Sequence, residues 1–261
     1  MIILVIGGMV VHNLIILGYY FRRKWLMERN KPTLTRFNLQ EILQHVLLSI
    51  TFIGLVITGF ALRFSENTMF QRLAAAGLNE DLRSTLHRIF AVGLLAAGVW
   101  HMIYLGFHKT GRKQLRAILF VIEDMRQAVL NLRHHLGLTK ERPLFDRYDY
   151  SEKAEYWALI WGTVVMAATG FVLWFPTFFT QFLPFWIVKV SEVVHYYEAI
   201  LATLAIIVWH FFFVILHPEE YPMNLSWLSG KVTVDLAEEK YPVWAHRELH
   251  KPKSKPKLVE E

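Results

Sequence analysis

Five long apolar runs constrain this chain more than any other feature of its sequence. They cover residues 1–20, about 43–63, about 84–106, about 155–176 and about 192–216. A helix needs roughly 20 mostly apolar residues to cross the hydrocarbon core of a bilayer. The sequence therefore predicts an all-α integral membrane protein.

The first run is expected to be retained as a membrane helix. It begins at Met1 with no basic stretch before it, and the basic segment FRRKW follows it. This charge order is the reverse of that in a secretory signal peptide, and no small-residue cleavage site is evident.

Lysine and arginine are distributed unevenly between the runs. Segment 21–44 contains six of them and the connection 107–153 contains ten, whereas 177–191 contains only one. Positively charged loops remain on the cytoplasmic side of a membrane. We therefore expect five passes with the N-terminus outside and the C-terminal tail, 233–261, in the cytoplasm. Topology then explains the net charge of +6 better than nucleic-acid binding does.

The connection between the third and fourth runs contains apolar residues at helical spacing. This pattern, over about 112–136, predicts an amphipathic helix that lies at the membrane interface or docks on the bundle. The C-terminal segment KPKSKPKLVEE is rich in proline and lysine, so we expect it to be disordered. No internal repeat is evident, and a single domain is the simplest interpretation.

Cysteine is absent from the chain, whereas histidine occurs 12 times. The absence of thiols excludes disulfides, iron–sulfur clusters and the covalent attachment of c-type haem. Any redox cofactor must therefore be held by other side chains, and histidine is the most suitable of those present.

Five histidines lie at two depths within three of the runs. In the expected orientation, His87 and His195 lie in the outer half of the membrane, and His45, His101 and His210 lie in the inner half. The 14 residues from His87 to His101 correspond to about 21 Å along a helix and to nearly four whole turns. Two layers of imidazoles on facing helices suit two b-type haems, which need no covalent attachment.

Several stretches resemble one family of bacterial membrane cytochromes b. This family contains formate dehydrogenase gamma subunits and the b-type cytochrome subunits of nickel–iron hydrogenases. The resemblance covers most of residues 36–232. The stretches that carry it are RFNLQEILQHVLLSITFIGLVITGFAL (36–62), LHRIFAVGLL (86–95), RYDYSEKAEYW (147–157) and the last run through LSGKV (228–232).

The resemblance implies a four-helix haem-binding bundle within residues 21–232, to which the helix at 1–20 is an addition. It also implies that His45 and His210 ligate the inner haem iron and that His87 and His195 ligate the outer one.

The family's quinone site corresponds to Asp149, Ser151, Glu152 and Lys153, and the quinone would be menaquinone or ubiquinone. Asp149, Ser151 and Glu152 stand where the formate dehydrogenase subunit has Asn, Gly and Gln. These differences leave the quinone contacts open.

Three alternatives for the ligands remain open. His101 is an alternative ligand of the inner haem, since in quinol–cytochrome c reductases the ligands pair between two helices. The spacing of 15 residues between His195 and His210 suggests a local bulge or a shifted ligand. A third haem held by His12 and His101 is the remaining alternative.

Other residues are candidates for supporting roles. Gly59 would let a porphyrin approach the helix backbone, or it would allow close helix packing. The acids and the base near the start of the fourth run could exchange protons for a quinone; they are Asp149, Glu152, Lys153 and Glu155. The cations at the ends of the runs could contact haem propionates or anchor the helices; they are Arg36, Arg63, Arg88 and Lys189.

The leading functional hypothesis is a cytochrome b subunit of the bacterial inner membrane. It would pass electrons between the quinone pool and an outer-side redox subunit, namely an iron–sulfur protein, a multihaem cytochrome c or a dehydrogenase. The chain has no dehydrogenase centre of its own, and lipid is its other expected contact. The alternatives are a transmembrane ferric or metal reductase and a histidine-lined metal transporter. A transporter would need its ligands at one depth, whereas these layers are about 21 Å apart.

Overall fold

The computed structural model describes residues 2–251, with side chains from Leu4 onward. Five helices in this part of the chain are long and apolar enough to cross a membrane. The prediction of an all-α integral membrane protein is therefore confirmed. These helices are α1 (Ile2–Glu28), α2 (Leu39–Arg63), α4 (Glu80–Phe107), α7 (Tyr150–Trp174) and α9 (Trp186–Leu204), and α9 continues as the π-helical segments η1 (Ala205–His210) and η2 (Phe212–Leu216).

Short elements connect these helices. They are β1 (Thr33–Thr35), α3 (Thr68–Ala75), α5 (Lys109–Ile118), α6 (Ile122–His135), α8 (Pro176–Phe179), α10 (Ser226–Ser229), β2 (Lys231–Thr233), α11 (Val234–Lys240) and α12 (Pro242–Leu249). The segment predicted as one amphipathic helix over 112–136 thus forms two helices, α5 and α6. Most of KPKSKPKLVEE, for which disorder was expected, lies outside the described residues.

The chain divides into two compact units, where the sequence suggested a single domain. One unit contains the residues up to Arg36, Ala117–Lys153 and the residues from Pro222 onward. The other contains Phe37–Arg116 and Ala154–Tyr221. The second unit, called the bundle unit below, contains α2, α4, most of α7, and α9 with its π-helical continuation.

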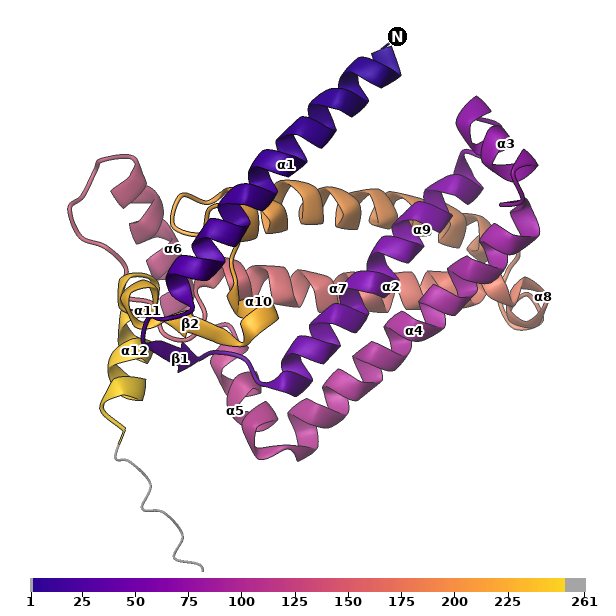
Figure 1. The fold of residues 1–261 in the computed structure, drawn as a ribbon. Coiled ribbons are helices and arrows are strands. Elements are labelled where there is room, and N and C mark those ends of the chain that lie inside the picture. Colours follow the sequence, from indigo (N-terminus) through magenta and orange to yellow (C-terminus); the bar gives the residue numbers. More distant parts are fainter. Residues whose placement is uncertain (1, 252–261) are drawn as a thin grey trace, which may run out of the picture. The chain divides into compact units, whose positions relative to one another are not determined.

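Within the bundle unit, α2 and α4 run side by side (Figure 1). Their close approach depends on Gly54, because a Cβ atom there would lie 2.6 Å from the ring of Phe90. At the start of α2, Asn38 and Glu41 form a reciprocal capping box. The Glu41 carboxylate also accepts hydrogen bonds from Tyr104 Oη and Gln114 Nε2, both at 2.7 Å. This network ties the end of α4 and α5 to the start of α2.

The other unit has a small core around a two-stranded sheet. β1 and β2 pair antiparallel, with Leu34 opposite Val232 (Figure 1). Val232 packs with Tyr241 and Trp244, which are among the largest fully buried side chains in the described part of the chain. The residues from Val234 to Leu249 are therefore folded into helices, in the segment for which the sequence suggested only a tail.

The last membrane helix changes its hydrogen-bonding pattern before His210. The π-helical segment η1 covers Ala205–His210, and the Phe211 amide bonds to the Ile206 carbonyl, five residues earlier. A π-helical turn accommodates one more residue than an α-helical turn. The local bulge suggested by the 15-residue spacing from His195 is therefore present.

Candidate functional site

Four of the membrane histidines form two facing pairs in the bundle unit. His45 on α2 and His210 on η1 have ring centroids 6.3 Å apart, with an interplanar angle of 38°. His87 on α4 and His195 on α9 have ring centroids 6.4 Å apart, with an interplanar angle of 70°. We call the level that contains His45, His101 and His210 the His45 layer, and the other the His87 layer.

These separations suit an iron atom between two imidazoles. With metal–nitrogen bonds of about 2 Å, an iron midway between two rings would place their centroids roughly 6 Å apart. Both pairs match this distance, so the four rings fit a bis-histidine haem at each layer.

In the His87 layer, threonine hydroxyls orient the imidazoles. Thr58 Oγ1 lies 2.9 Å from His87 Nδ1, and Thr169 Oγ1 lies 2.9 Å from His195 Nδ1. Each hydroxyl donates its single proton to a backbone carbonyl four residues earlier. The hydroxyl oxygens must therefore accept from Nδ1–H, which leaves the Nε2 lone pair of each ring available to a metal.

A carboxylate takes the same position next to His210. Glu155 Oε1 lies 2.5 Å from His210 Nδ1. The contact has an ion-pair distance but not the geometry of a hydrogen bond. A carboxylate there favours a proton on Nδ1, which would leave the lone pair of Nε2 for a metal. Glu155, predicted as part of a proton-exchanging cluster, is thus placed against a candidate haem ligand.

The glycine that follows each threonine leaves room for a histidine ring. A Cβ atom on Gly59 would lie 3.2 Å from His87 Cε1, and one on Gly170 would lie 3.4 Å from His195 Cε1. A larger residue at Gly59 would displace the imidazole, because 3.2 Å is less than a normal carbon–carbon contact. Gly59 therefore serves the candidate ligand His87 directly.

His101, the alternative ligand, has a partner at each ring nitrogen. Its Nδ1 lies 2.8 Å from Gln44 Oε1, and its Nε2 lies 3.0 Å from Tyr156 Oη. In the structure, His45 rather than His101 faces His210. His12 on α1 is exposed, and its Nδ1 lies 3.2 Å from Asn13 Oδ1.

The predicted quinone residues form the start of α7. Asp149 Oδ1 accepts from Ser151 Oγ at 2.6 Å and from the Glu152 amide at 2.9 Å. Glu152 Oε2 accepts in return from the Asp149 amide at 3.1 Å. Asp149 and Glu152 therefore form a capping box, the same device that begins α2.

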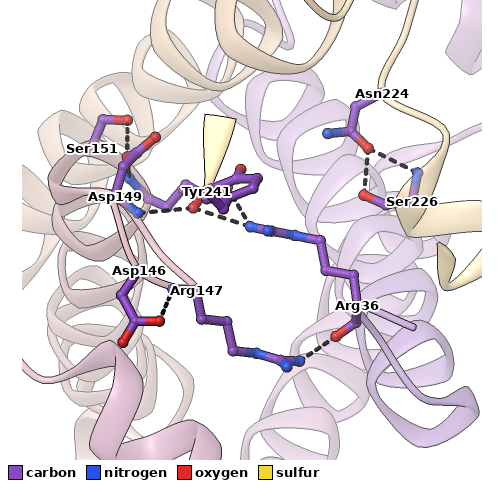
Figure 2. Close-up of polar contacts among 9 residues, drawn as sticks. Arg36, Asp146, Arg147, Asp149, Ser151, Asn224, Ser226 and Tyr241 are labelled. Carbon is purple, nitrogen blue, oxygen red and sulfur yellow. Dashed lines mark hydrogen bonds and ion pairs between the residues drawn. The ribbon is translucent and has the colours of Figure 1, made fainter. Parts of the chain in front are cut away.

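A buried cation holds this capping box. The Arg36 side chain donates to Glu152 Oε1 at 2.9 Å, and its guanidinium carbon lies 3.8 Å from the centre of the Tyr241 ring. Tyr241 Oη donates to the same Glu152 oxygen at 2.7 Å. Figure 2 shows Arg36 extended toward Tyr241, with the Arg147 guanidinium donating to the Arg36 carbonyl. Arg36, predicted as a propionate contact, is thus engaged with Glu152.

Lys153 is also paired. Its ammonium group donates to both carboxylate oxygens of Asp124 on α6, at 2.7 and 2.9 Å, and both side chains are buried. The Asp149 carboxyl differs, because burial and the neighbouring Glu152 charge raise its pKa above the usual value. Asp149 is therefore the member of this group that most readily takes up a proton.

The three remaining candidate propionate cations lie in the bundle unit, Arg63 at the end of α2, Lys189 in the first turn of α9 and Arg88 within α4. Arg63 lies 3.8 Å from Glu192 and over the ring of Tyr196, and Lys189 lies 3.4 Å from the same glutamate. Arg88 lies over the Trp174 ring, 5.4 Å from its centre.

An open, largely apolar groove of about 270 Å³ lies at the end of α4 in the bundle unit. Its lining residues are Gln40, Trp100, Ile103, Tyr104, Phe107 and His108. Aromatic side chains with a few polar groups are typical of sites for small organic ligands, although this volume is at the small end of their range.

Comparison with known proteins agrees with this geometry. Residues 36–223 match the family described as prokaryotic cytochrome b561. The chain belongs to this family. The match contains both histidine pairs, both threonines and the start of α7. A prokaryotic cytochrome b561 is a membrane b-type cytochrome that transfers electrons, and this one is a bacterial inner-membrane protein.

This cytochrome b561-family protein is also similar to the "Formate dehydrogenase, cytochrome b556(fdo) subunit" of Escherichia coli K12. The two are 22% identical over 233 residues, which cover 85% of this chain and 96% of the relative. The corresponding subunits of the O6:H1 and O157:H7 strains match equally well. All of α1 precedes the family match.

The sequence reasoning missed the residues that orient the ligands. Thr58 and Thr169 were not singled out, and neither were Gln44 and Tyr156. One signal was available, because a Thr-Gly-Phe triplet occurs at residues 58–60 and again at 169–171. A triplet that occurs in two apolar runs predicts a shared role in packing or ligand support.

Proposed function

We propose that this cytochrome holds two b haems and transfers electrons between membrane quinone and a redox partner on the outer side. The observation that supports this best is that two pairs of imidazoles face each other at two levels of one bundle. The ring centroids are 6.3 Å apart in one pair and 6.4 Å apart in the other. The haem would supply one-electron redox chemistry at its iron. The protein would hold the iron, orient the imidazoles and exclude water.

In this proposal His45 and His210 ligate one haem, and His87 and His195 ligate the other. The two sites differ in the group behind the ligand. Glu155 offers a negative charge to His210, whereas Thr58 and Thr169 offer neutral hydroxyls. Hydrogen bonding and charge next to an axial ligand set the reduction potential of a haem. The two haems should therefore have different potentials, which favours electron transfer in steps.

The test is haem content measured on purified variants. His87→Ala and His195→Ala should each remove one haem and keep the other, and so should His45→Ala and His210→Ala. Pyridine haemochrome analysis gives the amount, and reduced-minus-oxidised spectra identify b-type bands. Retention of two haems in all four variants would refute the ligand assignment.

We further propose that menaquinone or ubiquinone exchanges electrons near the His45 layer. The residues favoured by the resemblance are Asp149, Ser151, Glu152 and Lys153. Their contacts support a proton-handling role for Asp149, whose pKa is raised, more than for Lys153, which is ion-paired with Asp124. Reduction of a quinone consumes protons, so an acid that protonates readily is useful next to it.

The groove at the end of α4 is a second candidate place for the quinone ring. Parallel variants separate the two places: Ser151→Ala at the start of α7, and Trp100→Ala in the groove. The variant that raises the quinol concentration needed for half-maximal haem reduction, with haem content unchanged, identifies the site. Loss of haem without any change in quinol dependence would exclude both.

The partner is proposed from the similarity to a formate dehydrogenase subunit. The expected partner is an outer-side dehydrogenase, an iron–sulfur protein or a multihaem cytochrome c, which would supply the catalytic centre of the complex. Helix α1 lies outside the family match, and its described side chains are almost all exposed. Such a helix is available for a membrane-spanning segment of a partner. Co-purification followed by mass spectrometry tests this.

The positions of the basic segments support the proposed topology, with the N-terminus outside and the C-terminus in the cytoplasm. Helix α6 would then lie on the inner membrane surface. Its apolar residues are exposed, including Ile122 at 89% and Met125 at 71%, and such a stripe suits the boundary between headgroups and acyl chains. Fusions of alkaline phosphatase and green fluorescent protein to each end would test the orientation.

A transmembrane ferric reductase would share the two haems but not a need for quinone. Reduction of the haems by a quinol analogue in purified protein separates the two functions. Reduction by quinol supports our proposal, whereas electron transfer to ferric chelates with no response to quinol would support the reductase. A metal transporter would show no b-type absorption bands.

A further inference from the structure

Helices α2 and α7 begin and end in the same way. The segments RFNLQEILQHVLLSITFIGLVITGFAL (36–62) and RYDYSEKAEYWALIWGTVVMAATGFVL (147–173) align without a gap. Each starts with arginine, then forms a capping box, Asn38 with Glu41 and Asp149 with Glu152. Each ends in Thr-Gly-Phe-x-Leu, with the same number of residues between cap and threonine.

Helices α4 and α9 are related in the same way. His87 corresponds to His195, and each helix continues to a Val-Trp-His triplet, at 99–101 and at 208–210. The second interval is longer by one residue, and η1 accommodates the insertion. The two triplets therefore occupy equivalent places in their helices, although their distances in sequence from His87 and His195 differ by one residue.

The contacts repeat as well. Thr58 on α2 bonds His87 on α4, and Thr169 on α7 bonds His195 on α9. Behind the triplet histidines, Gln44 on α2 bonds His101 at 2.8 Å, and Glu155 on α7 contacts His210 at 2.5 Å. Since the sequences, caps and contacts all agree, the bundle consists of two related helix pairs, α2–α4 and α7–α9.

Two further cation–π contacts are related by the same two-fold correspondence, with the cation and the ring on exchanged helices. Arg63 of α2 lies over the ring of Tyr196 of α9, at 4.8 Å. In the equivalent contact, Arg88 of α4 lies over the ring of Trp174 of α7, at 5.4 Å. Position 63 corresponds to 174, and 88 corresponds to 196, so the same cation–π contact forms with the roles reversed.

Under this correspondence the His87–His195 pair maps onto itself, whereas the other pair does not. His210 maps onto His101, and His45 maps onto Tyr156. The contact between His45 and His210, at a ring separation of 6.3 Å, therefore has a twin between Tyr156 and His101, at 5.8 Å. The His45 layer contains two equivalent sites, and one has tyrosine in place of a ligand histidine.

We propose that His101 and Tyr156 form a latent second haem-binding site, closed by the tyrosine hydroxyl. Gln44 Oε1 accepts from the Nδ1–H of His101, so its Nε2 is the unprotonated nitrogen. Tyr156 Oη donates to this Nε2 at 3.0 Å and uses the lone pair that an iron would need. At the equivalent position opposite His210, the structure has the His45 ring in place of a tyrosine hydroxyl. The residue at positions 45 and 156 thus decides which site holds the metalloporphyrin.

The inference rests on the proposed ligation of a haem by His45 and His210, and a ligand exchange tests it. His45→Tyr should remove one haem. The double variant His45→Tyr/Tyr156→His should recover it, with the iron now held by His101 and the new histidine. The His87–His195 haem is present throughout and reports that each variant has folded. We expect about two haems per protein in the natural sequence, about one in His45→Tyr and about two again in the double variant.

His101 supplies the matched control. His101→Ala in the natural background should keep both haems, whereas in the exchanged background it should remove the recovered one. His45→Ala/Tyr156→His tests the same ligand without a phenol at position 45. If His45→Tyr keeps both haems, the ligation of the proposed function is wrong and this inference with it. If His45→Tyr loses one haem and neither double variant recovers it while the other haem remains, the latent site alone is refuted.

Discussion

Removing the charge of Glu155 should raise the reduction potential of one haem and leave the other unchanged. Glu155 Oε1 lies 2.5 Å from His210 Nδ1. With the imidazole ring and an iron–nitrogen bond added, the carboxylate would lie about 6–7 Å from the iron of the proposed haem. A negative charge at this distance favours the ferric over the ferrous state, because the ferric iron carries one more positive charge.

The magnitude follows from Coulomb's law. At an effective dielectric constant of about 20, one charge at 6.5 Å contributes about 2.5 kcal/mol. For a one-electron couple this corresponds to roughly 110 mV, since about 59 mV is a factor of ten. The Glu155 and His210 side chains are 27% and 26% exposed, and screening lowers the effect. We therefore expect Glu155→Gln to raise the potential by about 50–100 mV.

The assay is a spectroscopic redox titration of the purified protein. The two proposed b haems should titrate separately, and Glu155→Gln should move one midpoint upward while its haem content is retained. Glu123→Gln on α6, which removes an exposed acid, is the control and should move neither midpoint. Unchanged midpoints, or an equal rise at both haems, would contradict the assignment of Glu155 to one ligand.

Three further predictions concern haem binding and stability. Thr58→Val or Thr169→Val should weaken haem binding at the His87 layer by about 10–100-fold, since the orienting acceptor is lost; haem retention during dilution in detergent measures this. Arg36→Ala should lower the free energy of unfolding by about 1–3 kcal/mol, because Glu152 loses a hydrogen-bonded cation but keeps Tyr241; chemical unfolding measures this. A loss below about 1 kcal/mol would contradict a structural role. Because the pKa of Asp149 is raised on folding, stability should fall as pH rises from the unfolded pKa through the folded one. Asp149→Asn keeps the helix cap and should remove this pH dependence of stability. Asp149→Ala should remove it too, and should also lower the free energy of unfolding by about 1 kcal/mol because the cap is lost.

Much of the membrane architecture could be predicted because it depends on local composition. Apolar runs of sufficient length become helices wherever they occur in a bilayer. The two levels of histidines followed from helical rise alone. The folded segment after Val234 could not be predicted in this way, because Trp244 and Tyr241 belong to a core that also contains Leu34 of β1 and Phe145, which are distant in sequence.

The sequence also concealed its internal repeat. Few residues are identical between 36–62 and 147–173, since lipid-facing positions accept almost any apolar side chain. The equivalence becomes clear only when contacts are compared, because Gln44 and Glu155 differ chemically yet both contact the Nδ1 atom of a histidine. The one-residue insertion before His210 hides the relationship further, and only the π-helical segment accounts for it.

The sequence by itself determined that this chain has five runs long and apolar enough to cross a membrane, with histidines at two levels along them. Hydropathy and helical rise are properties of each segment alone, and they require no knowledge of neighbours. Only the tertiary structure decided which imidazoles face each other and which side chains contact their Nδ1 atoms. A lone pair is directed by the group that takes the opposite proton, and for His87, His101 and His195 that group comes from another helix.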